Sequence, residues 1–394
     1  MLNHEVCNKR TILFFCYSLQ GGGAERALVE LINHLNQRNF KPVLFLFKKE
    51  GTYLNIISSD VEIIELKEFV GYKRTLKFKR KLLKIIEQYK PHLLVSTLTG
   101  TNRTFLRALS FIKGKISVPT VIIEQNNLTA KLKLINPLKR IFVRLDIKYL
   151  YSYADKIVAV SHGIKEDLVD NYNFFQDSVT VIHNPVLINN IKKIIAESND
   201  DSSLLTSNGY KTLVAVGRLV EQKAYPDLLK AFSMVCREVP SKLIILGEGP
   251  LRASLNALIE SLQIKDYVEM PGFLENPWRV IANADLFVSA SHWEGHPLST
   301  LEALACGTAA VVTDCNYGPR EIIQDGKNGL LVPVGDTETM YKKIVDLLKN
   351  DQLRKNLAIN AQKRAWEFDI SVVTRKYEEL FEALIDNSWS KPGY

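Results

Sequence analysis

The chain has 394 residues, of which 46% are hydrophobic and 24% are charged, a composition that fits a folded globular protein and argues against a disordered or fibrous one. This length is too great for one ordinary hydrophobic core and predicts two or three domains. The five cysteines are widely spaced and form no C-x-x-C pair, which argues against a disulfide or metal framework and favours a reducing compartment.

The net charge of +8 is concentrated in two basic segments of the N-terminal half. Residues 67–90 hold nine Lys and Arg against two Glu, and residues 131–148 hold six against one Asp. Such blocks predict a positively charged face, although each could also be the solvated side of a helix. No apolar stretch approaches the roughly 20 residues that a membrane-spanning helix needs.

The first predicted element is a strand in "KRTILFFCYSL" (residues 9–19). Basic residues before an apolar run are also typical of a signal peptide, but a glycine turn and an amphipathic helical pattern follow at once, which favours the strand. Further strand-length apolar runs alternate with helical patterns in this half, at residues 42–48, 61–66, 92–98, 120–125 and 156–163. Because these runs have no polar face, we expect a parallel sheet covered by helices on both sides.

Residues 189–210 are rich in Asn, Ser and Asp and are the best candidate for a domain linker. A second alternating series follows, with strand-length runs at residues 211–219, 242–250, 267–273, 285–291, 309–314 and 329–333. We therefore expect an α/β protein of two doubly wound domains facing each other across a cleft, residues 1–188 and residues 189–371. Ligands of such sheets bind outside the carboxyl ends of the strands, so the loops after strands are the candidate sites.

The first such loop is "SLQGGGAERALVE". Gly22 and Gly23 would let the backbone approach a ligand closely, and the helix that begins near Ala24 would point its free N–H groups at an anion. The alternative is that this glycine turn only connects a strand to a helix, which is common in proteins.

A second loop, "VGRLVEQKAYPDLL", follows the first strand of the second series. Arg218 and Lys223 bring a forked guanidinium and a compact ammonium group to one strand end, which suits a diphosphate. The alternative is two solvated surface cations. In "LGEGPLR", by contrast, we interpret Gly247 and Gly249 as structural, because Pro250 fits the start of a helix.

The third loop is "SHWEGHPLSTLEALACGT", in which Pro297 fits a helix start and Gly307 fits its end. Glu294 then lies in the turn, and Glu302 lies on the second helical turn. The neighbours of Glu302 are nearly all apolar, so two carboxylates here indicate a polar ligand such as a sugar with its ribose. The alternative is that Glu294 caps the helix and Glu302 is solvated.

Several catalytic classes lack their sequence signatures. There is no H-E-x-x-H or carboxylate cluster for a catalytic metal, no G-x-S-x-G hydrolase elbow, and no G-x-G-x-x-G of a dinucleotide-dependent oxidoreductase. The basic segments do not interleave with aromatic residues, so nucleic acid is not an expected partner. We expect a reaction that needs neither a metal nor a cofactor.

Together these motifs resemble the family 4 retaining glycosyltransferases. The matching segments stand in the family's order and span nearly the whole chain: "GGAER", "GRLVEQKAYPDLLKAF", "LGEGP", "EGHPLSTLEALACG" and "GPREIIQDGKNGLLVPVGD". Their most specific element is the E-x7-E pair formed by Glu294 and Glu302. The resemblance implies a GT-B fold of two Rossmann-like domains, a donor bound mostly by the C-terminal one, and a last helix (about 372–394) that packs back on the N-terminal one.

The resemblance also implies roles for individual residues. Arg218 and Lys223 would hold the donor diphosphate, Glu294 would lie against the donor sugar near the reacting carbon, and Glu302 would bind the ribose. Glu294, Arg218 and Lys223 are thus the candidate catalytic residues. The further donor contacts implied are Gly22 and Gly23 at the phosphates, Phe273 and Leu274 at the base, and His296, Pro297, Leu298 and Ser299 at the sugar hydroxyls and phosphate. Retention implies same-face attack, so Glu294 need not be a nucleophile.

The chain departs from the family pattern at three places. Ala224 stands where a glycine usually follows the lysine, a replacement that we expect to cost little. His296 stands where Phe is frequent and could alter contacts to the donor sugar. "EQNN" (residues 124–127) stands where many members carry a histidine near the acceptor, which leaves Asn126 and Asn127 as the candidate acceptor-side residues.

The implied function is transfer of a sugar from a nucleotide-sugar to a lipid-linked glycan or another cell-surface glycan. The segment "TDCNYGPREII" resembles members that use UDP-linked sugars, often N-acetylhexosamines. The basic segment 72–90 could lie on anionic lipid with its apolar residues inward, which would place the enzyme peripherally on the cytoplasmic face of a membrane, in lipopolysaccharide or polysaccharide synthesis.

Two other functions stay open on these residues. A nucleotide-sugar epimerase or a phosphorylase would share the scaffold but would transfer no sugar to an acceptor. A non-catalytic adaptor at a membrane surface would use the basic segments alone, and would lose no activity when Glu294 or Lys223 is replaced by Ala.

Overall fold

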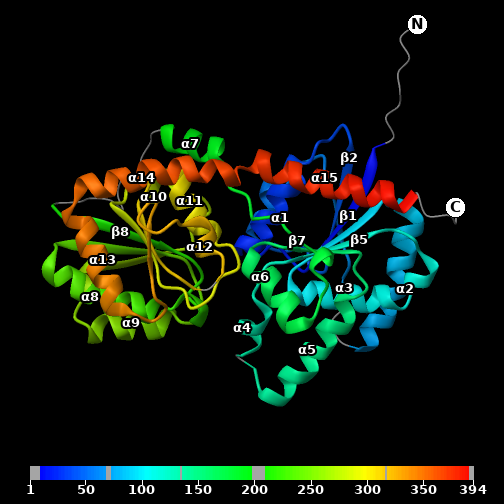
Figure 1. The fold of residues 1–394 in the computed structure, drawn as a ribbon, viewed down its shortest axis with the longest axis horizontal. Helices are drawn as coiled ribbons and strands as arrows, with labels where there is room; N and C mark the ends of the chain where they lie inside the picture. Colours follow the sequence, from blue (N-terminus) through cyan, green and yellow to red (C-terminus); the bar gives the residue numbers. More distant parts are fainter. Residues whose placement is uncertain (1–8, 68–71, 134, 198–208, 316, 390–394) are drawn as a thin grey trace, which may run out of the picture. The chain divides into compact units, whose positions relative to one another are not determined.

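The computed structural model describes residues 9–67, 72–133, 135–197, 209–315 and 317–389. It divides into two compact units. The second unit is Val186–Asp369, and the first combines the chain up to Pro185 with the segment from Ile370 onward (Figure 1). Each unit is a parallel sheet between helices, so the predicted α/β fold with two doubly wound domains is confirmed.

The sheet of the first unit has seven strands in the order β3-β2-β1-β4-β5-β6-β7, and every neighbouring pair is parallel. The strands are β1 (Arg10–Cys16), β2 (Phe40–Leu46), β3 (Glu62–Glu65), β4 (Leu93–Thr97), β5 (Thr120–Glu124), β6 (Lys156–Ala159) and β7 (Val179–Val181). The apolar run near the N-terminus thus forms the interior strand β1, in which every side chain from Ile12 to Cys16 is buried. The prediction of a strand there is confirmed.

Seven α-helices accompany this sheet among the described residues: α1 (Gly23–His34), α2 (Tyr72–Tyr89), α3 (Thr99–Ser110), α4 (Leu128–Leu132), α5 (Pro137–Tyr151), α6 (His162–Glu166) and α15 (Ile370–Trp389). The last helix, drawn in red in Figure 1, belongs to this unit. Its Val373, Tyr377 and Phe381 side chains are buried in the core of the first unit. The backbone N–H of Asn36 also donates to Glu378 Oε1 at 2.7 Å.

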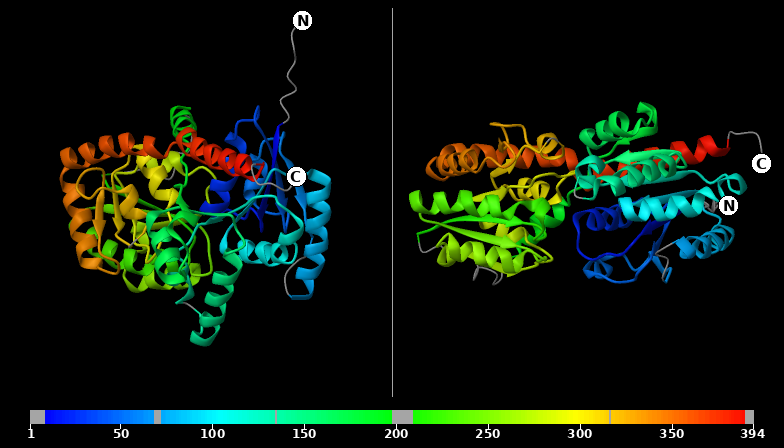
Figure 2. Two further views of the ribbon diagram at one scale, coloured as in Figure 1. Left: turned by 45° about the vertical axis from the view of Figure 1, so that its right-hand side comes forward. Right: turned by 90° about the horizontal axis from the view of Figure 1, so that it is seen from below.

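The sheet of the second unit has six parallel strands in the order β10-β9-β8-β11-β12-β13. The strands are β8 (Lys211–Val216), β9 (Ser241–Leu246), β10 (Val268–Gly272), β11 (Leu286–Ser289), β12 (Ala310–Thr313) and β13 (Leu330–Val332). The helices are α7 (Ile188–Ala196), α8 (Tyr225–Glu238), α9 (Arg252–Ser261), α10 (Trp278–Asn283), α11 (Leu298–Cys306), α12 (Pro319–Ile322), α13 (Thr337–Lys349) and α14 (Asp351–Ala365). Figure 2 shows helices on both sides of each sheet.

The second sheet is buried on both faces, which explains its continuous apolar sequence. Leu213 and Ala215 of β8 pack in one hydrophobic cluster with α8, α9 and α13. Val214, between them, packs in another cluster with α7, α10, α11 and α14. Side chains of a strand alternate between its two faces, so apolar residues are needed at every position.

The predicted linker 189–210 is wrong over its first part. Residues 188–196 form α7, and Ile188 and Ile191 are buried in the second unit. The polar composition that suggested a linker is the exposed side of an amphipathic helix. Residues 198–208 of the predicted linker lie outside the described residues.

The basic segment 72–90 contains helix α2 (Tyr72–Tyr89), in which four large apolar side chains face the protein core. Phe78, Leu82, Ile85 and Ile86 are buried in the core of the first unit. The interpretation that these apolar side chains rest on lipid is therefore wrong. Within the described ranges, no helix combines the length and hydrophobicity needed to cross a membrane.

Both sheets reverse their strand order beside the first strand. The reversal lies between β1 and β4 in the first unit and between β8 and β11 in the second. Loops that leave the carboxyl ends of two such strands diverge and open a crevice, which is where ligands of doubly wound sheets bind. Gly22 and Gly23 follow β1, Arg218 and Lys223 follow β8, and Glu294 follows β11.

Candidate functional site

The strongest candidate site lies in the second unit, at the carboxyl ends of β8 and β11. The two strands are hydrogen-bonded neighbours, with Leu286 opposite Leu213 and Phe287 opposite Val214. The loop after β8 carries Arg218 and Lys223, and the loop after β11 carries Glu294. Sheet topology therefore brings together residues that are far apart in the sequence.

Lys223 and Glu294 are in direct contact. Lys223 Nζ lies 2.5 Å from Glu294 Oε1, and the Lys223 side chain is 17% exposed while that of Glu294 is 8% exposed. An ion pair so largely removed from water is restricted in geometry and weakly screened by salt. Two of the three candidate catalytic residues are thus in direct contact with each other.

Glu294 is held by two further side chains that the sequence reasoning missed. Ser291 Oγ donates to Glu294 Oε1 at 2.7 Å, and Gln222 Nε2 donates to Oε2 at 3.4 Å and to the Trp293 carbonyl at 2.9 Å. Gln222 immediately precedes Lys223, and Ser291 lies three residues before Glu294, so both were close in sequence to predicted residues. Neither residue type by itself indicates a role in positioning a carboxylate.

The charge of Glu294 also acts on its buried neighbours. Burial raises the pKa of the Tyr225 phenol, and the nearby Glu294 carboxylate raises it further. The same two causes raise the pKa of the Cys315 thiol. Tyr225 stays protonated and donates its hydroxyl to the Gly217 carbonyl at 2.9 Å, which fixes the start of the cation-bearing loop.

Arg218 is exposed, and its guanidinium makes no hydrogen bond or ion pair with any residue in the described part of the chain. The backbone beside it is tightly packed. A Cβ at Gly247 would lie 2.0 Å from the Gly217 carbonyl oxygen, and one at Gly249 would lie 2.5 Å from that of Leu219. These two glycines therefore let the loop after β9 pack against the loop that carries Arg218.

Ala224 ends this loop in a left-handed backbone conformation, with φ 46° and ψ 41°. A side chain in this conformation costs about 1–2 kcal/mol, which is why glycine is favoured there. The replacement of glycine by Ala224 thus has a backbone cost that its sequence position did not reveal.

Glu302 lies on α11, five residues into the helix, and is nearly buried. The indole N–H of Trp278 on α10 donates to Glu302 Oε1 at 3.0 Å. Trp278 is also a residue that the sequence reasoning missed, because it lies 24 positions away and reads as an ordinary core residue. Its hydrogen bond helps to orient the Glu302 carboxylate.

The N-terminus of α11 begins directly after Pro297, which has no side-chain acceptor to cap the helix. The backbone N–H groups of Leu298 and Ser299 therefore have no carbonyl partner within the helix and suit an anion. Gly307 ends the helix in the left-handed conformation, so both predicted helix limits are confirmed.

The side chain of His296 is buried, and its ring lies 5.2 Å from that of Phe368. It thus fills an aromatic packing position, in keeping with the Phe that is frequent there.

Phe273 and Leu274 follow the carboxyl end of β10, and the Phe273 side chain is 42% exposed. An exposed aromatic ring at a strand end can stack on a flat ligand such as a base.

In the first unit, Gly22 and Gly23 lie at the start of α1, after β1. A Cβ at Gly22 would lie 2.1 Å from Glu25 Oε2, so the Glu25 carboxylate rests against Gly22 at the helix N-terminus. A side chain at Gly22 would therefore displace the flexible Glu25 carboxylate. The positive end of the α1 dipole thus already faces one carboxylate of the chain itself.

The acceptor-side candidates follow β5, where Glu124 is completely buried. Its carboxylate accepts from Tyr151 Oη at 2.6 Å, from Thr99 Oγ1 at 2.9 Å and from the Asn126 backbone N–H at 3.1 Å. Burial raises the pKa of Glu124, and these hydrogen bonds oppose that rise. Asn127 Oδ1 accepts from the Ala130 backbone N–H at 2.7 Å and so caps α4. The Asn127 side chain is buried, whereas that of Asn126 is partly exposed.

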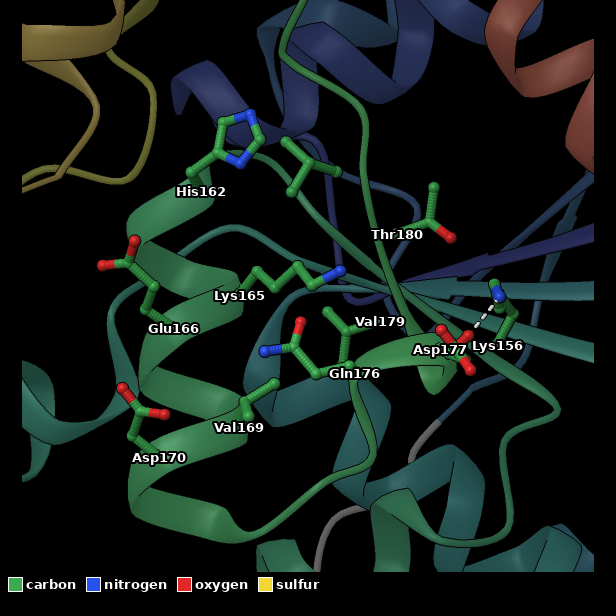
Figure 3. A pocket seen from close by; sticks show the side chains of 11 residues that line it. Lys156, His162, Lys165, Glu166, Val169, Asp170, Gln176, Asp177, Val179 and Thr180 are labelled. Atoms are coloured by element: carbon green, nitrogen blue, oxygen red, sulfur yellow. Dashed lines mark hydrogen bonds between the residues drawn. The ribbon is translucent and has the colours of Figure 1, made fainter.

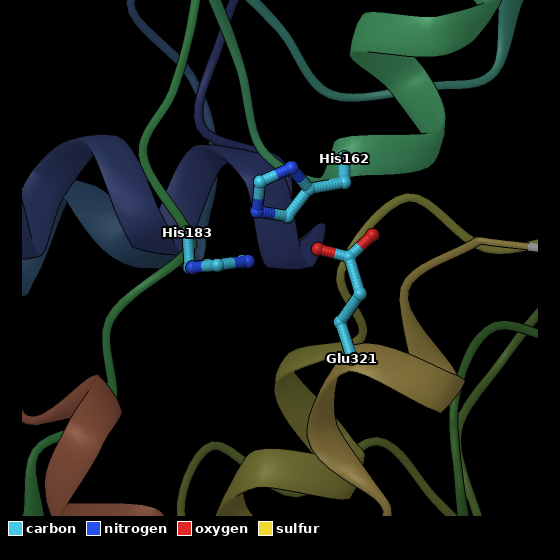
Figure 4. A group of neighbouring side chains, drawn as sticks. All are labelled: His162, His183 and Glu321. Carbon is cyan, nitrogen blue, oxygen red and sulfur yellow. The ribbon is translucent and has the colours of Figure 1, made fainter.

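A pocket of about 620 Å³ lies elsewhere in the first unit, between α6 and the strands β6 and β7, of which β7 is the edge strand (Figure 3). Lys156, Lys165 and Asp170 are among its lining residues, and the Lys156 ammonium donates to the Asp177 carbonyl. Nearby, the rings of His162 and His183 lie with their centroids 5.9 Å apart (Figure 4). No predicted site residue lines this pocket.

Two family models match the chain, one over each half. The model described as Glycosyltransferase Family 4 matches residues 21–189, and the model described as Glycosyl transferases group 1 matches residues 197–364. The second match covers the loops that carry Arg218, Lys223, Glu294 and Glu302.

Two curated relatives come from Campylobacter jejuni. One is the N-acetylgalactosamine-N,N'-diacetylbacillosaminyl-diphospho-undecaprenol 4-alpha-N-acetylgalactosaminyltransferase, which is 31% identical over 374 residues, 92% of this chain and 96% of the relative. The other is the GalNAc-alpha-(1->4)-GalNAc-alpha-(1->3)-diNAcBac-PP-undecaprenol alpha-1,4-N-acetyl-D-galactosaminyltransferase, which is 28% identical over 378 residues, 94% of this chain and 97% of the relative.

Among solved structures, HepE of Anabaena in complex with UDP-glucose has a TM-score of 0.78 at 19% identity, covering 95% of this chain and 99% of that protein. At this identity the likeness shows the fold alone, two Rossmann-like domains of the GT-B type. The predicted GT-B fold is confirmed.

Proposed function

Because the chain belongs to the family 4, group 1 glycosyltransferases, we propose that it transfers an N-acetylhexosamine from a UDP-linked donor to a lipid-linked glycan, with retention of configuration. The observation that carries the proposal is the contact between Lys223 Nζ and Glu294 Oε1 at 2.5 Å. The bond that breaks in the reaction joins the anomeric carbon of the sugar to the distal phosphate. A residue for the sugar and a residue for that phosphate must therefore be neighbours, as Glu294 and Lys223 are.

The leaving group is a nucleoside diphosphate, whose negative charge grows as the glycosidic bond breaks. Lys223, the exposed Arg218 and the uncapped N-terminus of α11 would offset this charge. Such preorganised donors stabilise charge without a metal ion, and we propose that the reaction is metal-independent. Arg218 suits the diphosphate because its fork of N–H groups can bind two phosphate oxygens together.

Glu294 suits an electrostatic and positioning role. Its carboxylate oxygens accept from Lys223, Ser291 and Gln222, which leaves few lone pairs for attack on carbon. In same-face attack the acceptor hydroxyl replaces the diphosphate on the side that it leaves, and the departing phosphate oxygen takes the hydroxyl proton. Glu294 would then stabilise the positive charge that develops on the sugar ring.

Glu302 would bind the ribose hydroxyls, since the indole N–H of Trp278 fixes its carboxylate. The backbone around Phe273 and Leu274 would meet the base, and the segment from His296 to Ser299 would meet the sugar and phosphate. Gly22 and Gly23 would approach the phosphates from the first unit. Asn126, which is partly exposed, is the stronger of the two acceptor-side candidates, because the Asn127 side chain caps α4.

The choice of donor and acceptor is supported by the relatives. The two Campylobacter jejuni relatives are named as N-acetylgalactosaminyltransferases of diphospho-undecaprenol glycans, and the HepE structure contains UDP-glucose. A lipid-linked acceptor places the reaction at a membrane surface. We therefore propose a peripheral enzyme on the cytoplasmic face, in the synthesis of a cell-surface polysaccharide or lipopolysaccharide.

The test is a panel of UDP- and GDP-linked sugars incubated with the purified chain and an undecaprenyl-diphosphate-linked glycan, with nucleotide release as the readout. We expect release from a UDP-N-acetylhexosamine that depends on the acceptor and persists in EDTA. Acceptor-independent conversion of the donor would instead indicate an epimerase. No nucleotide release with any donor, and no difference between the native chain and Lys223→Ala, would favour a non-catalytic adaptor.

A further inference from the structure

Helix α5 carries a stripe of large apolar side chains that face solvent. Of the exposed large hydrophobic residues in the described part of the chain, the following lie on this helix, with their exposed fractions: Leu138 71%, Ile141 57%, Phe142 72%, Leu145 58% and Tyr149 60%. We call these five residues the apolar face of α5. So much exposed apolar surface on one element of a folded protein indicates a binding surface.

The spacing of these residues places them on one side of the helix. Positions three, four, seven and eleven residues apart share a face of an α-helix. The opposite side is buried, because Ile147, Leu150 and Tyr151 pack in the core of the first unit. α5 is therefore apolar on two sides, and only one of them is covered.

The helix is firmly attached to the rest of its unit. Arg103 Nε on α3 donates to Asp146 Oδ2 at 2.8 Å, and Arg107 of the same helix also donates to Asp146. The only acidic residue of α5 is therefore neutralised on the inner side. The apolar face is presented by a rigid helix, which Figure 1 shows extending from the lower part of the first unit.

Basic residues border the apolar face. Lys139 and Lys148 are exposed on the helix, and Lys131 and Lys133 are exposed just before it. None of these four ammonium groups forms an ion pair with a residue that the structure describes. An apolar stripe bordered by exposed lysines matches the chemistry of an anionic lipid surface, in which apolar side chains meet acyl chains and lysines meet negative headgroups.

We propose that the apolar face of α5 inserts into the headgroup region of an anionic membrane, with Lys131, Lys133, Lys139 and Lys148 binding the lipid headgroups. The proposal deepens the proposed function, on which it rests for the lipid anchor of the acceptor. It assigns the membrane contact to α5 instead of α2, in which Phe78, Leu82 and Ile85 are buried. α5 follows α4, which begins just beyond the carboxyl end of β5, so a lipid surface at α5 would lie on the acceptor-binding side of the first unit.

A second copy of the chain is a poorer occupant. In a two-fold dimer through α5 the same surface meets itself, so the lysines of one copy would border the lysines of the other. No acidic residue on the outer side of α5 would compensate them, because Asp146 faces α3.

The test is co-sedimentation of the full chain with vesicles of phosphatidylcholine, with and without phosphatidylglycerol. We expect binding to the anionic vesicles that weakens at least tenfold at high salt or without phosphatidylglycerol. The double variant Phe142→Gln, Leu145→Gln should lose at least tenfold of the vesicle affinity. The double variant Lys139→Gln, Lys148→Gln should lose about tenfold or more on anionic vesicles only. Ile359→Gln, on α14 of the second unit and 53% exposed, is the matched control and should bind as the native chain does.

Two readouts separate this inference from the proposed function. Transfer to a short-chain, water-soluble diphosphate acceptor should be unchanged in the Phe142→Gln, Leu145→Gln variant, while transfer to an acceptor embedded in vesicles should fall. Vesicle binding that depends on α5 without any sugar transfer would support the inference and contradict the proposed function.

Three results would overturn the inference: a native chain that does not bind anionic vesicles, binding that survives in the Phe142→Gln, Leu145→Gln variant, or a native dimer that this variant dissociates.

Discussion

Lys223 Nζ and Glu294 Oε1 lie 2.5 Å apart although the two residues are separated by 71 positions in the sequence. The contact joins the loop after β8 to the loop after β11, at the point where the strand order of the second sheet reverses. The contact places Lys223, the proposed phosphate ligand, next to Glu294, the proposed sugar ligand. The catalytic proposal depends on this contact.

Replacing Lys223 by Ala should lower kcat about 10²–10³-fold, because a charged donor to the leaving diphosphate is lost. Lys223→Arg should retain more activity than Lys223→Ala, since it keeps the charge. The measurement is steady-state UDP release with saturating acceptor. Lys230→Ala, a change of the same type on α8, is the control and should leave kcat unchanged. Equal activity of Lys223→Ala and the native chain would contradict the assignment.

Replacing Trp278 by Phe removes the indole N–H that donates to Glu302 Oε1 at 3.0 Å. If Glu302 binds the ribose equally in ground state and transition state, the KM for the donor should rise about tenfold while kcat changes little. Trp366→Phe, at an exposed tryptophan, is the matched control and should leave KM unchanged. A fall of kcat without a change of KM would place Glu302 in the chemical step instead of in ribose binding.

Replacing Ala224 by Gly should stabilise the second unit, because Ala224 has φ 46°. Relief of the left-handed strain is worth about 1–2 kcal/mol, and the greater freedom of glycine in the unfolded chain offsets about 0.5–1 kcal/mol of that. We expect the free energy of unfolding to rise by roughly 0.5–1 kcal/mol in urea titrations. Gly307→Ala, at another left-handed position, should do the opposite. Destabilisation by Ala224→Gly would contradict this account of the loop.

The buried Glu124 should make the first unit less stable as the pH rises. Burial raises the pKa of Glu124 above its ordinary value of 4.5, so the folded chain binds this proton more tightly than the unfolded chain. The contribution of Glu124 to stability is therefore fully present below pH 4.5 and is lost as the pH rises through the folded pKa. Glu124→Gln removes this dependence.

The comparison to make is the free energy of unfolding of native chain and Glu124→Gln between about pH 5 and about pH 8. The free energy of unfolding of the variant, relative to that of the native chain, should increase as the pH rises. A difference that stays constant, or that moves the other way, would show that hydrogen bonds from Tyr151 and Thr99 outweigh the cost of burial.

The fold was predictable because strand-length apolar runs without a polar face are a strong local signal. All of the predicted strands are present, and the limits of α11 were readable from Pro297 and Gly307. Linker and surface interpretations were less reliable, because a polar sequence such as residues 189–196 is also what the outside of an amphipathic helix looks like.

The site residues that could be predicted are those marked by their spacing from strands and helices in the sequence. Those that depend on contacts between distant segments could not be predicted. Arg218, Lys223 and Glu294 lie in the loops that follow β8 and β11, so their position near the strand ends could be predicted. The hydrogen bond from Trp278 to Glu302 joins two helices and leaves no trace in either local sequence. In the same way, α2 and α5 both combine basic and apolar residues, and only tertiary packing determines which apolar side chains remain exposed.

The most direct test of the central claim is to identify the product. The chain is incubated with a UDP-N-acetylhexosamine and an undecaprenyl-diphosphate-linked glycan, and the acceptor is analysed by mass spectrometry and by NMR of the new anomeric proton. The account predicts a mass increase of one N-acetylhexosamine residue in an α-linkage, formed much more slowly by Glu294→Ala and Lys223→Ala. An unmodified acceptor with every UDP-sugar tested, or a β-linked product from an α-linked donor, would contradict it.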